Sequence, residues 1–421
     1  METESFYCLN HCLCCGIPDF NFLCDFKYVS IIFIFCVLKG DVNMEKHKQI
    51  LSRLLMIVWV PILVVTMIIN LVIPDKELST IENRSLQTFP SITMDSILDG
   101  SFEKELDTWF SDQFVGRNTF IHLKYIMNRL TGNKKIDDVY IAKSGLMEEA
   151  VEANGNQLNR NLNAINQFVS LYPDLNAEFL LVPNAISVQE DKLPSFVSGN
   201  LQNEQMDMVY NTLNSEIKKI DVRNTLKEHA DEYLYYKTDH HWTSLAAFYT
   251  FSDFSKQNGL GNTKKSDYDI YTVSTHFKGT LSNKTGSVGL KDTIEIYVPE
   301  NNSDYIYTNP SKSIKSRSLY SYQGLTSKDP YTVFLSGNSA YSKLEMNNDS
   351  NRRLIVFKDS YANAFIPFLV PYYRTITIID PRYYFEDISK VMVKECITDV
   401  LFLYNTNTFV LDTSLADVLG G

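Results

Sequence analysis

The chain has 421 residues, of which 44% are hydrophobic and 21% charged, and this composition excludes both a bulk membrane protein and a disordered chain. The 50 acidic residues outnumber the 39 basic ones, and the formal charge is −11. Because the sequence has no basic stripe, it lacks the electrostatic footprint of a duplex-binding protein, and we predict no nucleic-acid partner.

The first 43 residues differ in composition from the rest of the chain. They hold six of the seven cysteines, without the second pair that zinc-finger spacing requires. Their apolar stretch, residues 28–38, is too short to span a bilayer. Met44 then opens the sequence MEKHKQILSRLL, which is typical of the start of a signal-anchor protein. We therefore predict that residues 1–43 are an upstream extension or a cytoplasmic segment.

Residues 44–75 are predicted to form a transmembrane signal anchor. The twenty residues 54–73 carry no charge, and at about 1.5 Å of rise per residue they reach about 30 Å, the thickness of a hydrocarbon core. Lys46, Lys48 and Arg53 precede this run, which favours a cytoplasmic N-terminus and an extracytoplasmic C-terminal body. No small-residue cleavage site ends the run, so the pattern indicates a single-pass anchor in the cell membrane rather than a signal peptide. A buried core helix is the alternative.

Two regions follow the anchor. Apolar side chains recur at helical spacing between residues 97 and 129, so residues 76–135 are predicted to be a juxtamembrane helical region. From residue 136 to residue 421, short apolar runs alternate with amphipathic ones. The runs predicted as strands are 139–142, 178–182, 220–222, 333–335, 354–357, 375–379 and 400–404, and those predicted as helices are 159–171, 204–219 and 242–258.

This alternation predicts an α/β fold with a mostly parallel sheet that helices flank on both faces. Residues 262–330 are polar and rich in tyrosine, and we predict that they form an insertion in the domain spanning residues 136–421. Active sites of such folds lie at the carboxyl ends of the strands, so polar residues at those ends are the first candidates for a functional site.

One candidate is the segment 237–243, where an aspartate stands beside two adjacent histidines. The carboxylate of Asp239 can fix the tautomer of an imidazole and stabilise the imidazolium that forms when this base takes a proton. A metal site would need further ligands, and His229 and His276 are at no diagnostic spacing. We therefore predict no metal; a structural polar cluster is the other alternative.

The second candidate is Ser360, which follows the predicted strand 354–357 and precedes a predicted helix that starts at Tyr361. A serine on such a turn projects its hydroxyl above the carboxyl edge of the sheet, beside the free N–H groups of the helix start. We predict the backbone N–H of Ser360 or Tyr361, together with the side chain of Asn338, as oxyanion donors. The alternatives are that Ser360 is a helix N-cap and that Asn338 lies in a plain turn.

Taken together, the two candidates predict a catalytic triad. Serine is a weak nucleophile until a base removes its proton, and the chain offers one Asp–His pair and one well-presented serine. We interpret Ser360, His241 and Asp239 in this way. The sequence has no phosphate-binding loop, and the dinucleotide pattern fails at Lys264, so we predict no cofactor.

The letters DHHW at Asp239 to Trp242 resemble the motif of the DHHW protein family of bacterial cell-surface proteins. The resemblance covers residues 44–410, which leaves residues 1–43 outside it. Further segments resemble the family in the same order: Glu82-Asn-Arg84, Asp112-x-Phe114-x-x-Arg117, Phe277-x-Gly279-Thr280-Leu281, Lys358-Asp-Ser-Tyr361 and Ile379-Asp-Pro-Arg-Tyr-Tyr384.

This family is similar to the alginate O-acetyltransferases and their SGNH-hydrolase-like domain. The similarity implies that Asp239 matches the acid, His241 the base and Ser360 the nucleophile, while His240 falls on a variable position. It also implies a partner, a membrane-bound O-acyltransferase that delivers acyl groups across the membrane. The sequence departs from those enzymes at Lys358 and the aspartate after it, where they have small residues before the serine.

We therefore expect a membrane-anchored extracytoplasmic O-acyltransferase, of the O-acetyl type, that modifies a cell-surface polysaccharide through an acyl-enzyme. His240, Trp242 and Arg382 are candidate substrate-binding residues. Two alternatives stay open: a carbohydrate esterase with the same triad, and a non-catalytic glycan-binding or assembly protein of the cell surface. If the environment perturbs His241 little, activity should fall as the pH drops through about 6–7.

Overall fold

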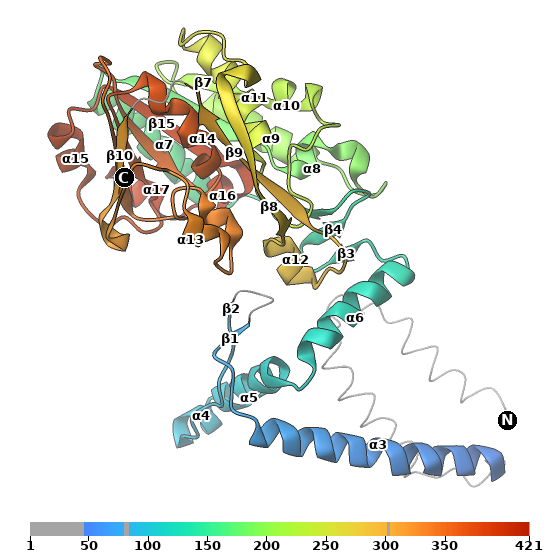
Figure 1. Ribbon diagram of the computed structural model, residues 1–421. Helices are drawn as coiled ribbons and strands as arrows, with labels where there is room; N and C mark the ends of the chain where they lie inside the picture. The colour runs from blue at the N-terminus through green and yellow to red at the C-terminus, as the bar shows by residue number, and fades with distance from the viewer. Residues whose placement is uncertain (1–45, 80–83, 301–303, 421) are drawn as a thin grey trace. The chain divides into compact units, whose positions relative to one another are not determined.

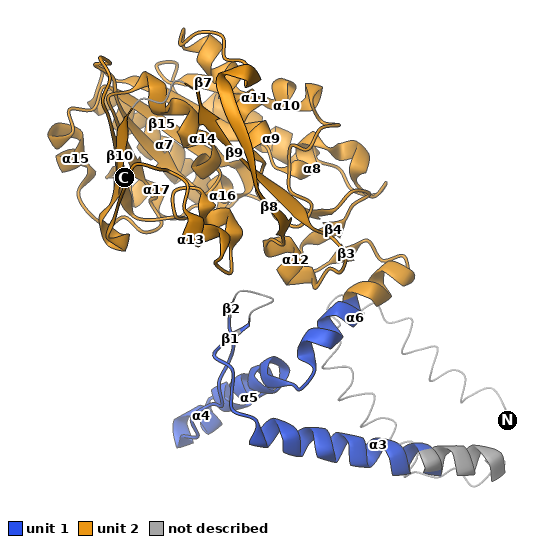
Figure 2. Ribbon diagram, in the orientation of Figure 1, with its two compact units in different colours: residues 1–79, 84–124 blue, residues 80–83, 125–421 orange. Residues whose placement is uncertain are grey.

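The computed structural model describes residues 46–79, 84–300 and 304–420. The predictions for residues 1–43, including the cysteine-rich stretch, therefore lie outside the described residues. The chain divides into two compact units, which Figure 2 colours separately: residues 1–79 with 84–124, and residues 80–83 with 125–421. Each unit is described by itself.

The first unit contains helix α3, Lys46–Val72, which has Pro61 inside it. Its stretch Leu55–Val72 is long and apolar enough to cross a membrane, and most of its large apolar side chains are exposed. Two short strands, β1 (Leu78–Ser79) and β2 (Arg84–Ser85), pair in antiparallel fashion. The helices that follow are α4 (Met94–Leu98), α5 (Ser101–Gln113) and α6 (Arg117–Leu130), whose last turns belong to the second unit.

Polar contacts join the end of α3 to α5. The side chain of Asp75 accepts from the indole Nε1 of Trp109 at 2.9 Å and from the backbone N of Phe89 at 2.7 Å. The buried Asn70 accepts from the backbone N of Val115 at 2.8 Å. These bonds place the first helices of the region 76–135 directly beside the end of α3 within this unit.

The second unit is built on an eight-stranded sheet (Figure 1). In spatial order the strands are β11 (Ile314–Ser316), β10 (Tyr305–Asn309), β12 (Tyr341–Met346), β14 (Thr375–Ile379), β13 (Arg353–Lys358), β15 (Asp399–Asn405), β6 (Asn176–Val182) and β7 (Lys218–Asp221). The five strands from β14 to β7 are parallel, whereas β12, β10 and β11 are antiparallel to their neighbours. The α/β class is confirmed, and the sheet is mixed, with a parallel part of five strands and an antiparallel part of three.

The antiparallel side of the sheet comes partly from the region that we predicted to be an insertion. Residues 262–330 supply β10 and β11 of the main sheet, and also β8 (Tyr268–Phe277), which pairs with β9 (Asp292–Pro299). In β10 the alternate residues Tyr307 and Asn309 are buried, whereas β8 is buried only at its ends, Tyr268 and Phe277. This region is therefore part of the sheet framework and not an irregular excursion.

Side chains of the central strands alternate between two hydrophobic cores, one on each face of the sheet. In β13, Leu354 and Val356 join one core, and Ile355 and Phe357 join the other. The first core is covered by α10 (Arg223–Glu228), α11 (Ser244–Gln257) and α14 (Ala362–Leu369), and the second by α7 (Gly155–Leu171), α9 (Asn200–Thr212), α15 (Ile388–Lys394), α16 (Thr406–Leu411) and α17 (Leu415–Leu419). Helices thus flank the sheet on both faces, as predicted.

Shorter elements complete the unit. These are the three-stranded sheet β3 (Lys135–Ile136), β4 (Val139–Ile141) and β5 (Leu146–Glu148), helices α8 (Ala185–Val188), α12 (Thr280–Thr285) and α13 (Tyr322–Leu325), and single 3₁₀ turns at Glu190–Lys192, Lys265–Asp267, Pro310–Lys312, Pro330–Val333 and Val370–Tyr372. The segment 333–335 is not the strand that we predicted, because the 3₁₀ turn Pro330–Val333 leads into a left-handed turn. In that turn Leu335, Ser336 and Gly337 have φ values of 55°, 58° and 80°.

Candidate active site

The two predicted catalytic segments meet at the carboxyl edge of the parallel strands. The segment 236–241 is closed by an isolated bridge between Tyr235 and Trp242 and by a 3.2 Å bond from the backbone N of Tyr236 to the carbonyl of His241. Ser360 lies two residues after the last residue of β13, Lys358. The structure thus brings Asp239, His241 and Ser360 together.

The carboxylate of Asp239 is buried and has four hydrogen-bond contacts. Its Oδ1 accepts from the backbone N of His241 at 2.9 Å and contacts the ring Nδ1 of the same residue at 2.5 Å. Its Oδ2 accepts from the backbone N and the hydroxyl of Thr280, at 2.7 and 3.0 Å. Gly279 packs so closely that an added Cβ would lie 2.2 Å from the Cβ of Asp239. The carboxylate is therefore fixed from both sides.

The ring of His241 connects this carboxylate to the serine. Its Nε2 lies 2.7 Å from the Oγ of Ser360. The ring of Tyr331 stacks on the imidazole with the centroids 3.7 Å apart, and the Tyr331 hydroxyl donates to the carbonyl of Ser360 at 3.3 Å. The imidazole can therefore rotate little, and both of its nitrogens have a defined partner.

Ser360 is not the N-cap of the helix that follows it. Residue Tyr361 occupies that position, and no side chain caps α14. Asp359 instead fixes the turn, because its carboxylate accepts from the backbone N of Tyr361 and from that of Asn405, both at 2.8 Å. The Ser360 hydroxyl is consequently left to its contact with His241.

This arrangement leaves one of the two predicted backbone donors free. The backbone N–H of Tyr361 is already bound to Asp359 and is not available to an oxyanion. The backbone N–H of Ser360, the other predicted donor, has no acceptor among the described residues. The side-chain Oδ1 of Asn338 accepts from Lys358 Nζ at 2.8 Å and from Asn363 Nδ2 at 3.1 Å. Its Nδ2 has no acceptor in the described part of the chain and is left to donate.

Burial shifts the titration of both ionisable partners. Burial lowers the pKa of His241 to about 4, and the neighbouring His240 acts in the same direction. For Asp239, burial alone would raise the pKa, but the two imidazoles and the hydrogen bonds hold it well below its usual range. At neutral pH an ionised Asp239 can only accept, so Nδ1 of His241 carries the proton and Nε2 accepts from Ser360. The imidazole is thus in the form that a general base requires.

The same cluster has donor atoms that could hold a metal ion. Ligand atoms of Asp239, His240 and His241 lie within 4.8 Å of one another. A metal would displace the Asp239–His241 bond and the 2.7 Å contact of His240 Nδ1 with the hydroxyl of Thr280. His229 instead stacks on a tyrosine elsewhere, so it adds no ligand to this cluster.

The three predicted substrate-binding residues differ in their accessibility. Trp242 is fully buried, and its indole donates to the carbonyl of Tyr361 at 2.9 Å, so this ring supports the site from inside and is not available to a substrate. The His240 side chain is half-buried. Arg382 follows β14 and is about one third exposed; two of its nitrogens bond to Asp380 at 2.8 and 2.7 Å. Both could still contact a bound molecule.

Several residues that sequence reasoning missed also shape the site. Asp292, the first residue of β9, orders the loop that carries Asp239 and His241 by accepting from the backbone N of Lys237 at 2.8 Å and of Thr238 at 2.7 Å. Tyr331, which stacks on His241, lies between the predicted insertion 262–330 and the predicted strand 333–335, where no motif marks it. A signal existed for Asp359, because an aspartate whose side chain accepts from the N–H two residues later is typical of a tight turn.

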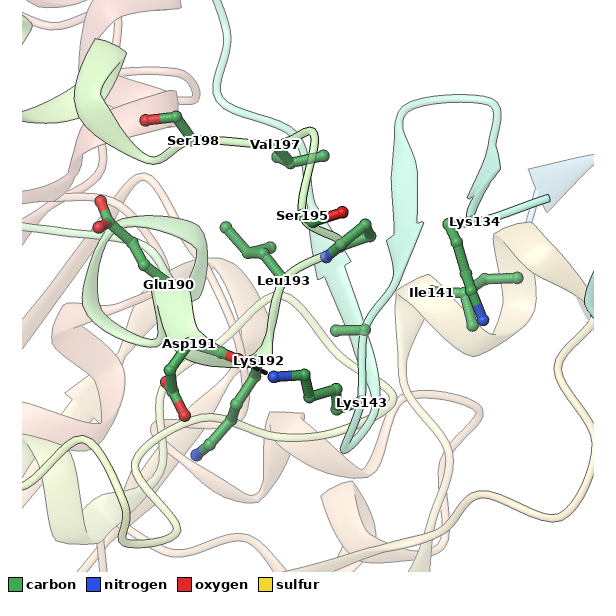
Figure 3. Close-up of a pocket in the computed structure, with 12 residues that line it drawn as sticks. Lys134, Ile141, Lys143, Glu190, Asp191, Lys192, Leu193, Ser195, Val197 and Ser198 are labelled. Atoms are coloured by element: carbon green, nitrogen blue, oxygen red, sulfur yellow. Dashed lines mark hydrogen bonds between the residues drawn. The ribbon is translucent and has the colours of Figure 1, made fainter. Parts of the chain in front are cut away.

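A separate cavity of about 640 Å³ lies between the β4–β5 hairpin and the 3₁₀ turn Glu190–Lys192 (Figure 3). Lys134, Lys143 and Lys192 line it together with acidic and small residues. None of the predicted site residues is among those that line it. The triad and this cavity are therefore different places on the second unit.

Comparisons with known proteins show the family and the fold of the chain. The sequence profile described as DHHW protein matches residues 82–170 and 162–379. The fold is similar to a DHHW family protein from Eubacterium siraeum (25% identity, TM-score 0.57, covering 67% of this chain and 94% of that one) and to Bacillus cereus PatB1 (21%, 0.56, 65% and 98%). The O-acetyltransferase domain of Pseudomonas putida AlgJ also matches (12%, 0.43, 66% and 94%). A search of the curated proteins found no match. The chain belongs to the DHHW protein family.

Proposed function

We propose that this protein is a membrane-anchored extracytoplasmic O-acyltransferase that transfers an acyl group, of the acetyl type, to a hydroxyl of a cell-surface polysaccharide. The observation that carries the proposal is the unbroken series of contacts from Asp239 through His241 to Ser360. Resemblance of the DHHW motif to the alginate O-acetyltransferases supports the choice of reaction, and we assign the second unit to the SGNH-hydrolase-like folds on the same ground.

In the first half-reaction, the Oγ of Ser360 attacks the acyl carbonyl while Nε2 of His241 takes the hydroxyl proton. Asp239 stabilises the resulting imidazolium. The negative charge on the carbonyl oxygen is met by the backbone N–H of Ser360 and by Nδ2 of Asn338. When the tetrahedral intermediate collapses, the donor's leaving group takes the proton from His241, and the acyl group stays on Ser360.

In the second half-reaction, a sugar hydroxyl attacks the acyl-serine. Neutral His241 removes the proton from this hydroxyl, and the same two donors hold the new oxyanion. The bond between the acyl carbon and Oγ then breaks, and the imidazolium returns its proton to Ser360. Water could enter in place of the sugar, so the extent of transfer depends on how well an acceptor occupies the site.

Helix α3 supports the location. A helix of this length and apolar character at the start of the described chain fits a single-pass anchor, with the catalytic unit on the outer side. Because an acyl donor of the cytoplasm must cross the membrane to reach Ser360, we infer that a membrane-bound O-acyltransferase is the partner. The net negative charge of the chain means that an anionic polymer would have to be recognised locally.

Ser360→Ala tests the proposal. The full-length chain in detergent is incubated with 4-nitrophenyl acetate and a mixture of envelope oligosaccharides, and acetate on sugar and free acetate are both measured. We expect both products to fall by a factor on the order of 10⁴ in the variant. The control is Ser255→Ala on α11, which removes a buried hydroxyl that donates to the carbonyl of Gly261. This variant should remain active.

The outcomes separate the alternatives. Acetate on sugar that depends on Ser360 supports a transferase, and free acetate alone would identify an esterase. Equal activity of Ser360→Ala and the unaltered chain would refute the assigned nucleophile. A properly folded unaltered chain that forms neither product would favour a glycan-binding or assembly role.

A further inference from the structure

Lys358 is a buried cation at the last position of β13, two residues before Ser360, and only 2% of its surface is exposed. Its ammonium donates to Oδ1 of Asn338 and to Oδ1 of Asn363, both at 2.8 Å. It also lies 3.6 Å from a carboxylate oxygen of Asp380. The ammonium of Lys358 is therefore held by groups at the carboxyl edge of the sheet.

Burying a lysine in a strand is unfavourable unless the charge is paired and hydrogen-bonded. The charged groups that face Lys358 are Asp380 and Arg382 at the end of β14 and Asp359 next to it in the chain. Asp380 already has Arg382 as a bidentate partner, so it does not need Lys358 to be neutralised. Pairing with Asp380 alone thus leaves the two asparagine contacts of Lys358 unexplained.

Lys358 and Asn363, which both contact Asn338, lie on either side of Ser360 in the chain. Lys358 precedes Ser360 by two residues, and Asn363 follows it by three, on the first turn of α14. Both donate to the same oxygen of Asn338. With Oδ1 held in this way, the carboxamide cannot flip, and Nδ2 stays on the opposite side of the group as a donor.

The backbone before Asn338 is strained, and hydrogen bonds hold it in place. Leu335 and Ser336 both adopt the left-handed conformation, which is unfavourable for residues other than glycine and persists where the surroundings enforce it. The carbonyl of Leu335 is held by the hydroxyl of Tyr307 at 2.9 Å, and that of Ser336 by Lys312. This strained turn, held by Tyr307 and Lys312, therefore places Asn338 within hydrogen-bond distance of the ammonium of Lys358.

We propose that Lys358 is a positioning residue that locks the carboxamide of Asn338, through its Oδ1, in the orientation in which Nδ2 donates to the oxyanion formed at Ser360. The inference rests on the proposed acyl-transfer function. The cation also polarises the amide, which strengthens its N–H donors. Lysine here replaces the small residues that precede the serine in the alginate O-acetyltransferases, so this device would distinguish the chain from them.

The test uses Lys358→Met in the full-length chain with 4-nitrophenyl acetate as substrate. Methionine keeps the length and removes every donor, and Asp380 retains Arg382 as its partner. We expect kcat to fall about 10- to 100-fold with KM changed less than about twofold, because the lost interaction forms only in the transition state. Asn338→Ala should lose about 10²- to 10³-fold, and the double variant should lose no more than Asn338→Ala alone.

Lys343→Met is the matched control. Lys343 is a partly buried lysine of β12 that pairs with Glu395 at 2.7 Å, away from the asparagine cluster, so its removal should leave kcat unchanged. A kcat of Lys358→Met within twofold of the unaltered chain would overturn the proposal, and so would losses that multiply in the double variant.

A pH profile keeps the proposal testable if Lys358→Met does not fold. Burial lowers the pKa of Lys358 to about 8, so kcat of the unaltered chain should decline as the pH rises through that value. Asn338→Ala should flatten this decline, and its persistence in Asn338→Ala would overturn the proposal. Loss of activity in Ser360→Ala with a fully active Lys358→Met would reject the positioning role while leaving the proposed function intact.

Discussion

Nε2 of His241 lies 2.7 Å from Oγ of Ser360, although 119 positions separate the two residues in the chain. The contact forms because β13 ends at the edge of the sheet where the bridge between Tyr235 and Trp242 closes the loop that carries His241. The two segments are further tied by the indole of Trp242 on the carbonyl of Tyr361. A proton can therefore pass between His241 and Ser360 without any rearrangement of the backbone.

Replacing Asp239 with asparagine should lower kcat by a factor on the order of 10⁴. The amide would favour the wrong tautomer of His241 and could not stabilise the imidazolium, whereas the size of the side chain stays the same. Steady-state hydrolysis of 4-nitrophenyl acetate measures the effect. Asp253→Asn, at a carboxylate of α11 that accepts from Thr225, should keep normal activity. A loss smaller than tenfold in Asp239→Asn would argue against its role.

The pH dependence of kcat/KM should show a low apparent pKa. His241 must be neutral to accept a proton, and burial lowers its pKa to about 4, well below the range expected for an unperturbed imidazole. We therefore expect constant activity from neutral pH to about 5.5 and a fall as the pH drops through about 4. Circular dichroism at each pH shows whether the fold persists. An inflection near pH 6.5 would contradict the effect of burial.

Gly279→Ala should lower kcat strongly and the free energy of unfolding only moderately. The added methyl group would lie 2.2 Å from the Cβ of Asp239, so the carboxylate or the segment carrying Thr280 must move. We expect a loss of about 1–3 kcal/mol in the free energy of unfolding and a kcat at least tenfold lower. Gly155→Ala is the control, because a Cβ added there would meet no atom within 4 Å. This variant should be neutral or slightly stabilising. Unchanged kcat in Gly279→Ala would show that Asp239 tolerates displacement.

Trp242→Phe should affect stability and turnover but not the binding of substrate. The indole is fully buried and packs against Tyr361 and Phe365, and its N–H donates to the carbonyl of Tyr361. Losing that bond and part of the packing should cost about 1–3 kcal/mol in urea denaturation. A rise in KM with unchanged stability would instead place the ring against the substrate.

Most of the central sheet could be predicted from the sequence, and its antiparallel side could not. Strands β6, β13 and β15 contain continuous apolar runs and β14 is a run of threonine and isoleucine, because both faces are buried, and such runs are easy to recognise. Strand β10 buries Tyr307 and Asn309 but exposes Ile306, so its sequence has no apolar run that marks a buried strand. Its place in the sheet depends on pairing with β12, a long-range contact.

Some residues of the candidate site could also be predicted from the sequence, and the roles of others could not. Asp239, His241 and Ser360 could be predicted because their chemistry is visible in the local sequence. The availability of an N–H or a ring depends on neighbours, and so the roles predicted for Tyr361 and Trp242 do not fit the structure. The contact of Lys358 with Asn338 depends on a left-handed turn that no local residue pattern indicates.

Acylation of Ser360 is the central claim, and mass spectrometry tests it most directly. The full-length chain is mixed with 4-nitrophenyl acetate, quenched rapidly in acid and digested. One acetyl group should appear on the peptide that contains Ser360, and it should be absent from the same peptide of His241→Ala. An acetyl group that forms equally without His241, or one found only on other residues, would contradict the account.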